Sequence, residues 1–365
     1  MSVIKRMSPD YGIEEREAVM RVFDSGSFVK GPEAKALEAE ICEYTGAQAC
    51  VTVNSGSTAL MLVYHLLSLR HEDRHYRPLN VLTTPASYVA TANVAKFLGQ
   101  RVLFSDISLD DYCLMALPVP EEVDVVSVVH LYGNGVKVEP FQVIYPSATL
   151  VEDCAQAFGT RVNGQHVGTT SFGCFSMFPT KNLSCAGDGG FILCSKEDYE
   201  DLIRLRDNGR FYGLDISLAS GNFRLSEMQA AVAREQLKKI DAQIARRQAV
   251  AERYNEAFKD FPGVLIPKFS EEVSHTWHLY CPLILPSARI SRDHLIENLQ
   301  SMGIQCSSVY PELITDVEPF KYSMNYGVSN AEILRDSVIS IPMHSQLTDE
   351  EVDEVIAAMT MFLED

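Results

Sequence analysis

Short apolar runs alternate with amphipathic stretches along the first half of the chain. The apolar runs are short and continuous, as in strands of a parallel sheet that helices cover on both faces, and they occupy residues 49–53, 80–84, 101–107, 123–133 and 148–159. Helical spacing follows Pro32 up to Tyr44, returns after Ser55, and returns again at residues 87–99. This order predicts a large α/β domain with a mostly parallel central sheet between helices.

Two further apolar runs, at residues 171–178 and 189–194, enclose a segment rich in small residues. That segment reads F-S-M-F-P-T-K-N-L-S-C-A-G-D-G-G and carries a single lysine, Lys181. The pattern therefore places Lys181 in a connection between two strands. Residues 208–224 are polar, rich in glycine and without periodicity, which predicts a long loop of the kind that often has a function.

The longest helical pattern covers residues 225–258 and opens with a capping box in which Ser226 precedes Gln229 by three positions. We expect it to bridge a large domain, residues 1–240, and a smaller α+β domain, residues 241–365. In the smaller domain the pattern predicts two strands, at residues 277–285 and 305–309. It also predicts two helices, at residues 291–303 and from residue 348 onward.

Composition narrows the possible functions. The formal charge is −18 without a basic cluster, so a nucleic-acid partner is not expected. The chain shows no signal-peptide pattern and no run of roughly 20 apolar residues, which favours a cytoplasmic protein without membrane contact. The nine cysteines lack C-x-x-C spacing, so we expect reduced thiols and no metal site.

Three segments could carry chemistry, and the first is Asn54-Ser-Gly-Ser-Thr-Ala59, between a predicted strand and a predicted helix. Free N–H groups and the helix dipole make such a turn an anion cradle. A simple helix cap would use the same residue types.

The second segment places Glu152 and Asp153 at the carboxyl end of an apolar strand, where open α/β sheets bind their ligands. We expect one of the two acids to point inward. A buried carboxylate requires a cationic partner, and a protonated ring nitrogen could serve. A helix cap or a surface acid is the alternative.

The third segment is the connection that holds Lys181. A lysine in a dry site loses its proton more readily, and its neutral amine can form a Schiff base with a carbonyl. A lysine that extends to the surface is the alternative. A phosphate cradle, an acid after a strand and then a lysine in a small-residue turn are together what pyridoxal phosphate requires.

These stretches resemble the DegT/DnrJ/EryC1/StrS family of pyridoxal-phosphate aminotransferases. The matching segments keep the family's order from about residue 50 to the C-terminus, and they read NSGSTAL, TTPASYVATANV, VVHLYG, VEDCAQAFGTRVNGQHVGT, CFSMFPTKNLSCAGDGG, LRDNGR, GNFRLSEMQAAVAREQL and SIPMHSQLTDEEVDEVI. The resemblance implies a fold-type I transferase with pyridoxal 5'-phosphate as cofactor.

The resemblance also implies roles for single residues. Lys181 aligns with the lysine that joins the cofactor as an aldimine and moves the proton. Asp153 aligns with the acid on the pyridine nitrogen, and Gln156 with the residue near the ring hydroxyl. The remaining implied cofactor contacts are the phosphate ligands Gly56, Ser57, Thr58 and Ser176, the stacking Tyr88, and Asn222, which the partner subunit donates in a homodimer.

The implied reaction transfers an amino group, from glutamate, to a keto group of a nucleotide-linked deoxysugar. The family's sugar 3-dehydratases carry a histidine in place of the lysine, so Lys181 favours transamination. Tyr310, Arg210 and Lys30 are the predicted substrate contacts. A keto-inositol or a keto sugar phosphate is an alternative substrate, and a regulatory protein that binds the cofactor without turnover is an alternative function.

Overall fold

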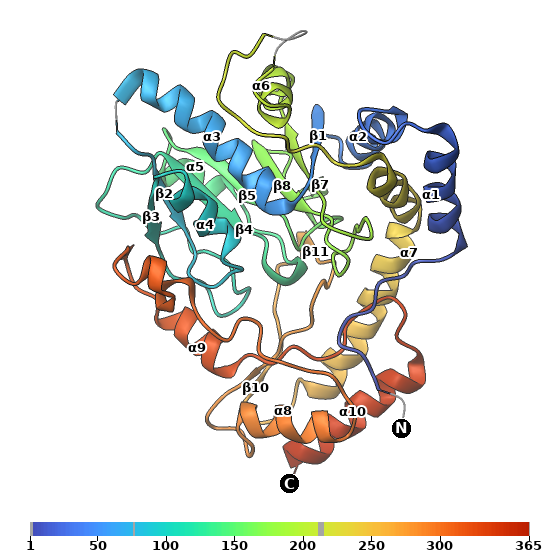
Figure 1. The fold of residues 1–365 in the computed structure, drawn as a ribbon. Helices are drawn as coiled ribbons and strands as arrows, with labels where there is room; N and C mark the ends of the chain where they lie inside the picture. Colours follow the sequence, from blue (N-terminus) through green and yellow to red (C-terminus); the bar gives the residue numbers. More distant parts are fainter. Residues whose placement is uncertain (1–2, 76, 211–214, 365) are drawn as a thin grey trace.

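An eight-stranded sheet forms the centre of the computed structural model, which describes residues 3–75, 77–210 and 215–364 (Figure 1). The strand order is β1-β9-β8-β5-β4-β2-β3-β13. All neighbouring pairs are parallel except the two that involve β9. The strands are β1 (Ala49–Val53), β2 (Asn80–Thr83), β3 (Arg101–Phe104), β4 (Val125–Val129), β5 (Thr149–Asp153), β8 (Phe172–Ser176), β9 (Gly190–Cys194) and β13 (Met324–Asn325).

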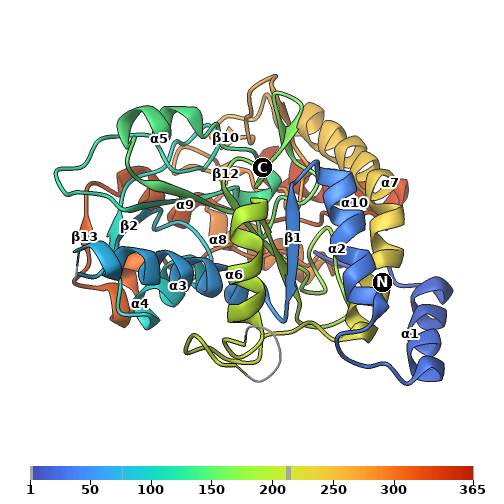
Figure 2. The same cartoon turned by 90° about the horizontal axis from the view of Figure 1, so that it is seen from above.

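Helices cover both faces of this sheet, as Figure 2 shows from above. On one face lie α3 (Gly56–His75), α4 (Ala90–Phe97) and α6 (Lys196–Arg206), whose apolar side chains share a core with β1, β2 and β8. On the other face α2 (Pro32–Thr45) and α5 (Glu139–Ile144) pack, in two separate cores. The predicted α/β architecture is confirmed.

The longest helix, α7 (Glu227–Phe258), connects the sheet with a second core formed by C-terminal residues. The Ser226 hydroxyl accepts the Gln229 N–H, as the capping box predicted. The first half of α7 packs against β8 and β9, whereas Tyr254 and Phe258 lie in the C-terminal core. A division of the chain near residue 240 remains a prediction, and Ile4 also packs into the C-terminal core, beside Ile304.

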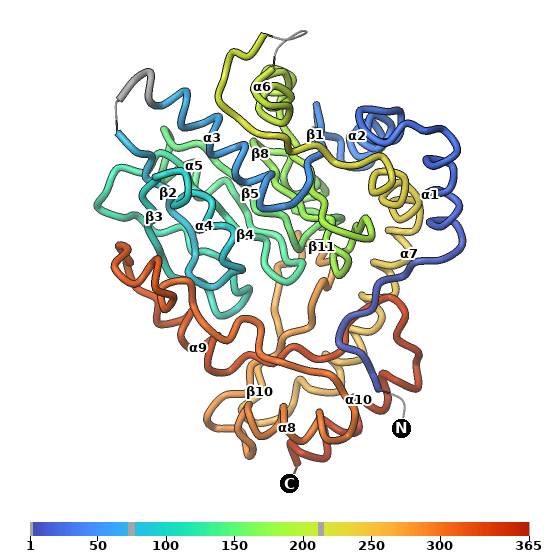
Figure 3. The backbone as a smooth tube through the Cα atoms, in the orientation of Figure 1, coloured from blue at the N-terminus to red at the C-terminus, as the bar shows by residue number. Residues whose placement is uncertain are grey.

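The C-terminal core is formed by short elements around α7, which Figure 3 traces as a continuous backbone. They are β10 (Val264–Leu265), β12 (Leu283–Ile284), α8 (Arg292–Ser301) and α10 (Asp349–Glu364), with α9 (Ser329–Ser337) toward the large sheet. The other α-helix and strands are the N-terminal helix α1 (Ile13–Ser25), which packs on α7, and a small sheet of β6 (Arg161–Val162), β7 (Gln165–His166) and β11 (Val273–Ser274).

Two strand predictions in the C-terminal part are wrong. Only Leu283–Ile284 of the run at 277–285 forms a strand, and the run at 305–309 makes a single bridge, from Ser307 to Ser340. Side chains rather than neighbouring strands satisfy part of this backbone, since the buried Arg247 guanidinium donates to the carbonyls of Trp277 and His278. Buried apolar runs without a ladder partner do not form strands.

The loop prediction for residues 208–224 falls partly outside the described residues, because 211–214 are not described. All nine cysteines are free thiols, and eight of them are buried. Among the residues that the structure describes, no helix is long and apolar enough to cross a membrane.

Candidate active site

A cavity of about 440 Å³ opens at the carboxyl ends of β4, β5 and β8. It contains eight of the residues predicted from the sequence: Gly56, Ser57, Tyr88, Asp153, Gln156, Ser176, Lys181 and Tyr310. These residues come from segments that are up to 254 positions apart (310 − 56), and the sheet brings them together because the ends of its parallel strands share one edge.

The turn from β1 into α3 forms one wall. The first N–H groups of α3 have no partner inside the helix, so Gly56 and Ser57 present donors and the positive helix end to the cavity. A Cβ at Gly56 would lie 2.7 Å from the Ser176 Cβ, so only glycine fits there. Thr58 lies outside the lining, because its hydroxyl donates to Asn54 Oδ1 at 2.7 Å.

The two acids at the end of β5 point to different surroundings, and both are buried rather than only one. Glu152 accepts hydrogen bonds from the His130 Nε2 at 3.0 Å and from the Gly168 N–H at 2.8 Å. Asp153 lines the cavity. Neighbouring positions on a strand face opposite sides of the sheet, and this alternation separates a structural acid from a site acid.

Asp153 is held by two donors. The Thr91 hydroxyl donates to its Oδ2 at 2.6 Å, and the Ala155 N–H donates to its Oδ1 at 3.1 Å. Burial raises the pKa of Asp153, while these two hydrogen bonds and the positive charge of Lys181 oppose the shift. Bonded donors on both oxygens favour the ionised form, which is suited to a cationic partner in the cavity.

Lys181 follows β8 and reaches the same cavity. Burial lowers its pKa to about 8, with the Asp153 charge acting in the opposite direction. Its ammonium makes no hydrogen bond or ion pair with the described residues. A lysine without a partner and with a depressed pKa supplies a neutral amine near physiological pH, which is the requirement for Schiff-base chemistry.

Gln156 and Tyr310 form the opposite wall. The Gln156 Oε1 accepts the Tyr132 N–H at 2.8 Å, and its Nε2 donates to the Tyr310 hydroxyl at 2.7 Å. The Tyr132 hydroxyl donates to the Val309 carbonyl, so Tyr132 ties the C-terminal segment that carries Tyr310 to the end of β4. Because the Tyr310 oxygen accepts from Gln156, its own proton is available to a ligand.

The aromatic ring of Tyr88 lies at the mouth, with its centroid 6.2 Å from that of Tyr310. Three residues that the sequence reasoning did not single out also belong here: Thr180 and Asp188 line the cavity, and Thr91 holds Asp153. The signal for Thr91 was its position three residues after Tyr88, on the same face of a predicted helix.

Besides Thr58, three further predicted residues do not reach the cavity within one chain. Lys30 is exposed and pairs with Asp207, Arg210 is exposed and bridges to Ile216, and Asn222 is exposed opposite Asp207. A residue that contacts the cofactor of a second subunit has to be exposed, as Asn222 is. Its role as a phosphate contact across a dimer interface remains a prediction.

The cavity fits pyridoxal phosphate on its own geometry. The α3 N-terminus and Ser176 suit a phosphate, the buried Asp153 suits a protonated ring nitrogen, and the Lys181 amine suits an aldehyde. The spacing at Gly56 leaves the backbone bare where a phosphate would approach.

The side chains of His130, Glu152 and Cys154 lie close enough together to suggest a metal site. The His130 Nδ1 accepts the Val136 N–H at 3.0 Å, so its Nε2 carries the proton donated to Glu152. Both ring nitrogens are therefore already used, and the cluster is a hydrogen-bonded support under β5.

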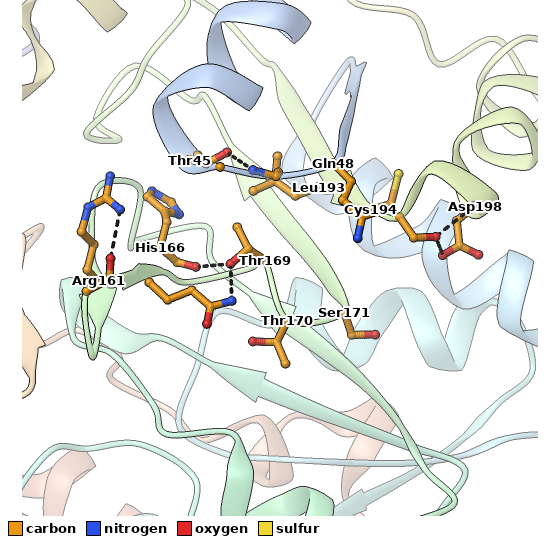
Figure 4. A pocket seen from close by; sticks show the side chains of 15 residues that line it. Thr45, Gln48, Arg161, His166, Thr169, Thr170, Ser171, Leu193, Cys194 and Asp198 are labelled. Carbon is orange, nitrogen blue, oxygen red and sulfur yellow. Dashed lines mark hydrogen bonds between the residues drawn. The ribbon is translucent and has the colours of Figure 1, made fainter.

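A second hollow, of about 470 Å³, lies at the opposite end of the strands (Figure 4). Its polar groups bind one another: the Thr169 hydroxyl donates to the His166 carbonyl and accepts from Gln165, Arg161 donates to the Gly164 carbonyl, and Ser195 donates to Asp198. Burial lowers the pKa of His166 to about 4. This hollow has no unpartnered buried charge in the described part of the chain.

Comparison with known proteins agrees with the geometry. The family model described as the DegT/DnrJ/EryC1/StrS aminotransferase family matches residues 9–360. The erythromycin biosynthesis sensory transduction protein EryC1 of Saccharopolyspora erythraea is 32% identical over 351 residues, which cover 94% of this chain and 93% of that protein.

Solved structures share the fold over nearly the whole chain. DesV of S. venezuelae, in complex with a ketimine intermediate, is 30% identical with a TM-score of 0.89, covering 97% of this chain and 95% of DesV. The E. coli GDP-4-keto-6-deoxy-D-mannose-3-dehydratase with bound hydrated PLP shares the fold with a TM-score of 0.91 at 24% identity, covering 98% of this chain and 100% of the dehydratase.

The cavity, the family match and the relatives lead to one conclusion. The predicted fold-type I architecture is confirmed, and the cofactor is pyridoxal phosphate. The chain belongs to the DegT/DnrJ/EryC1/StrS aminotransferase family of pyridoxal-phosphate-dependent enzymes.

Proposed function

We propose that this protein transfers an amino group from glutamate to a keto group of a nucleotide-linked deoxysugar. The observation that carries the proposal is the pairing of Lys181, whose pKa burial lowers to about 8, with the buried Asp153 in one cavity. A lysine rather than a histidine at this position favours transamination over dehydration, as the resemblance implied.

The residues that would hold the cofactor divide by its chemical groups. Gly56, Ser57 and Ser176 suit the phosphate, Asp153 the ring nitrogen, and Gln156 the ring oxygen. When bound, the cofactor supplies an electron sink for the charge that develops on the substrate carbon. Tyr88 lines the same cavity, and its ring would stack on the pyridine.

Lys181 would also serve as the group that moves the proton. An amine with a pKa near the working pH accepts a proton from the substrate carbon and returns it, which is the condition for efficient general acid–base catalysis. The Lys181 Nζ has no competing partner among the described residues, so it is free to swing between positions.

The mouth of the cavity supports a homodimer with shared sites. Tyr88 and Phe178, which line the cavity, are large side chains that are 60% and 46% exposed. A second subunit would cover such a surface and bring its own Asn222 to the phosphate. Tyr310, and Arg210 and Lys30 across the interface, are the proposed contacts for the nucleotide sugar. The E. coli structural neighbour is named for a nucleotide-linked keto-deoxysugar.

Two alternatives have support of their own. The EryC1 relative is named as a sensory transduction protein, which favours a regulatory protein that binds the cofactor without turnover. A keto-inositol or a keto sugar phosphate would need the same cofactor site and a different outer pocket.

The decisive experiment follows the absorbance of the cofactor-loaded protein while amino donors are added. We expect glutamate to convert the aldehyde-derived band to that of the amine form, and aspartate or lysine to convert it far more slowly. The amine form is then mixed with nucleotide-linked keto sugars, keto-inositols and keto sugar phosphates, and the return of the band identifies the acceptor. A band that no amino donor changes would contradict the proposal and favour the regulatory protein.

A further inference from the structure

The acid of the site, Asp153, accepts a hydrogen bond from a residue outside the cavity, Thr91. Thr91 lies in α4 and Asp153 ends β5, 62 positions later (153 − 91), and both are buried, at 0% and 5% exposure. Thr91 does not line the cavity, and no role follows for it from the family match. Among the residues that the structure describes, the one charged group hydrogen-bonded to it is the Asp153 carboxylate, at 2.6 Å.

The direction of this hydrogen bond is fixed by distance. The Thr91 oxygen lies 2.6 Å from Asp153 Oδ2, 3.2 Å from the Ser87 hydroxyl and 3.3 Å from the Tyr88 carbonyl. A separation of about 2.5–2.7 Å is that of a hydroxyl donating to an ionised oxygen. The hydroxyl has one proton, and the shortest contact receives it.

The same turn also carries the ring at the cavity mouth. Tyr88 and Thr91 are three residues apart at the start of α4, and the Tyr88 carbonyl accepts the Thr91 N–H. The Tyr64 hydroxyl, itself bonded to Ser127 on β4, lies 3.2 Å from the Thr91 carbonyl. These bonds hold the Thr91 backbone against the sheet, within reach of Asp153.

We propose that Thr91 is a positioning residue that keeps the Asp153 carboxylate ionised and aimed at the ring nitrogen of the cofactor. This inference rests on the proposed use of the cavity for pyridoxal phosphate. Thr91 acts only through Asp153. Without the hydroxyl, the carboxyl group in this buried place would take up the proton that the ring nitrogen otherwise carries.

The test is a double-mutant cycle on cofactor affinity, measured by equilibrium titration with pyridoxal phosphate. Thr91→Val keeps the shape and removes the hydroxyl. We expect Thr91→Val to weaken binding about tenfold, the value of one hydrogen bond to a charged group. In the Asp153→Asn background the same change should have no effect. An equal loss in both backgrounds would show a merely structural role and overturn the proposal.

A second readout reports the ring directly. With cofactor labelled with ¹⁵N at the ring nitrogen, Thr91→Val should move the resonance toward the unprotonated value, whereas Thr91→Ser should keep that of the unmodified protein. A Thr91→Ser variant that behaves like Thr91→Val would overturn the proposal. A protein that binds the cofactor but ignores amino donors contradicts the proposed function alone, and an unchanged Thr91→Val affinity contradicts the role of Thr91 alone.

Discussion

The two hollows at opposite ends of the strands are nearly equal in volume, about 440 and 470 Å³, and differ in how their polar groups are satisfied. In the hollow of Figure 4 the Thr169 hydroxyl, the Gln165 amide and the Arg161 guanidinium are hydrogen-bonded to neighbouring groups. In the active-site cavity the Lys181 ammonium, near the buried Asp153, has no hydrogen bond or ion pair with any residue that the structure describes. A buried charged group without a hydrogen bond, rather than cavity volume, distinguishes the active-site end of the sheet from the opposite end.

The largest expected effect comes from removing the charge that defines the active-site cavity. Lys181→Ala should lower transamination by roughly 10²–10⁴-fold or more, because it removes both the Schiff-base amine and the proton carrier. Steady-state and single-turnover rates with glutamate measure the loss. Lys196→Ala, on an exposed helix start, is the control and should retain full activity. Comparable losses of transamination rate in Lys181→Ala and Lys196→Ala would contradict the assignment of the active site to the Lys181 cavity.

A substitution at Glu152, the residue before Asp153, tests whether Glu152 contributes to folding stability alone. Glu152→Gln leaves an amide N–H₂ among donors from His130, Gly168 and Thr170, and should destabilise the protein by about 2–4 kcal/mol. Urea unfolding measures this loss. Cofactor affinity should stay unchanged, and a strong loss of affinity in folded protein would mean that Glu152 also belongs to the site.

The burial of Lys181 predicts a stability penalty in the cofactor-free protein. Its pKa is about 8 when folded and 10.5 ordinarily, so between these values the unfolded chain binds more protons and stability rises with pH. Below pH 8 the full penalty remains. Lys181→Met should therefore stabilise the cofactor-free protein at pH 7 by about 1–3 kcal/mol.

Urea unfolding at several pH values checks this gain, which should shrink as the pH rises from 8 to 10.5. Lys196→Met serves as the matched control without a gain. A Lys181→Met protein that is less stable than the unmodified protein at pH 7 would show that burial of the Lys181 ammonium does not destabilise the folded state.

The smallest effect is expected at the second hollow. Thr169→Val removes two neutral hydrogen bonds and should cost about 1 kcal/mol of folding stability. Cofactor affinity and activity should not change. Equilibrium titration with pyridoxal phosphate, as for Thr91→Val, measures the cofactor affinity. A reduced affinity would show that the second hollow affects the active site and would contradict the distinction between the two hollows.

Sequence patterns predicted the elements whose residues agree locally with the fold. The N-cap at Ser226, the strand that ends at Asp153 and the strand before Lys181 were found because propensity, periodicity and end signals coincide there, although Gln229 does not complete the predicted capping box. The runs at 277–285 and 305–309 misled the prediction, since an apolar run is buried equally well as irregular chain when side chains such as Arg247 satisfy its backbone.

The sequence by itself determined which chemistry is available: a phosphate-binding turn, an acid after a strand and a lysine in a small-residue connection. Only the tertiary structure decided which groups are used. In the folded chain Glu152 is hydrogen-bonded to His130, whereas Asp153 is hydrogen-bonded to Thr91. The Thr58 hydroxyl donates to Asn54, and Gln156 donates to Tyr310, which is distant in the sequence. Hydrogen-bond partners and desolvation depend on contacts between distant segments, and these contacts leave no local pattern in the sequence.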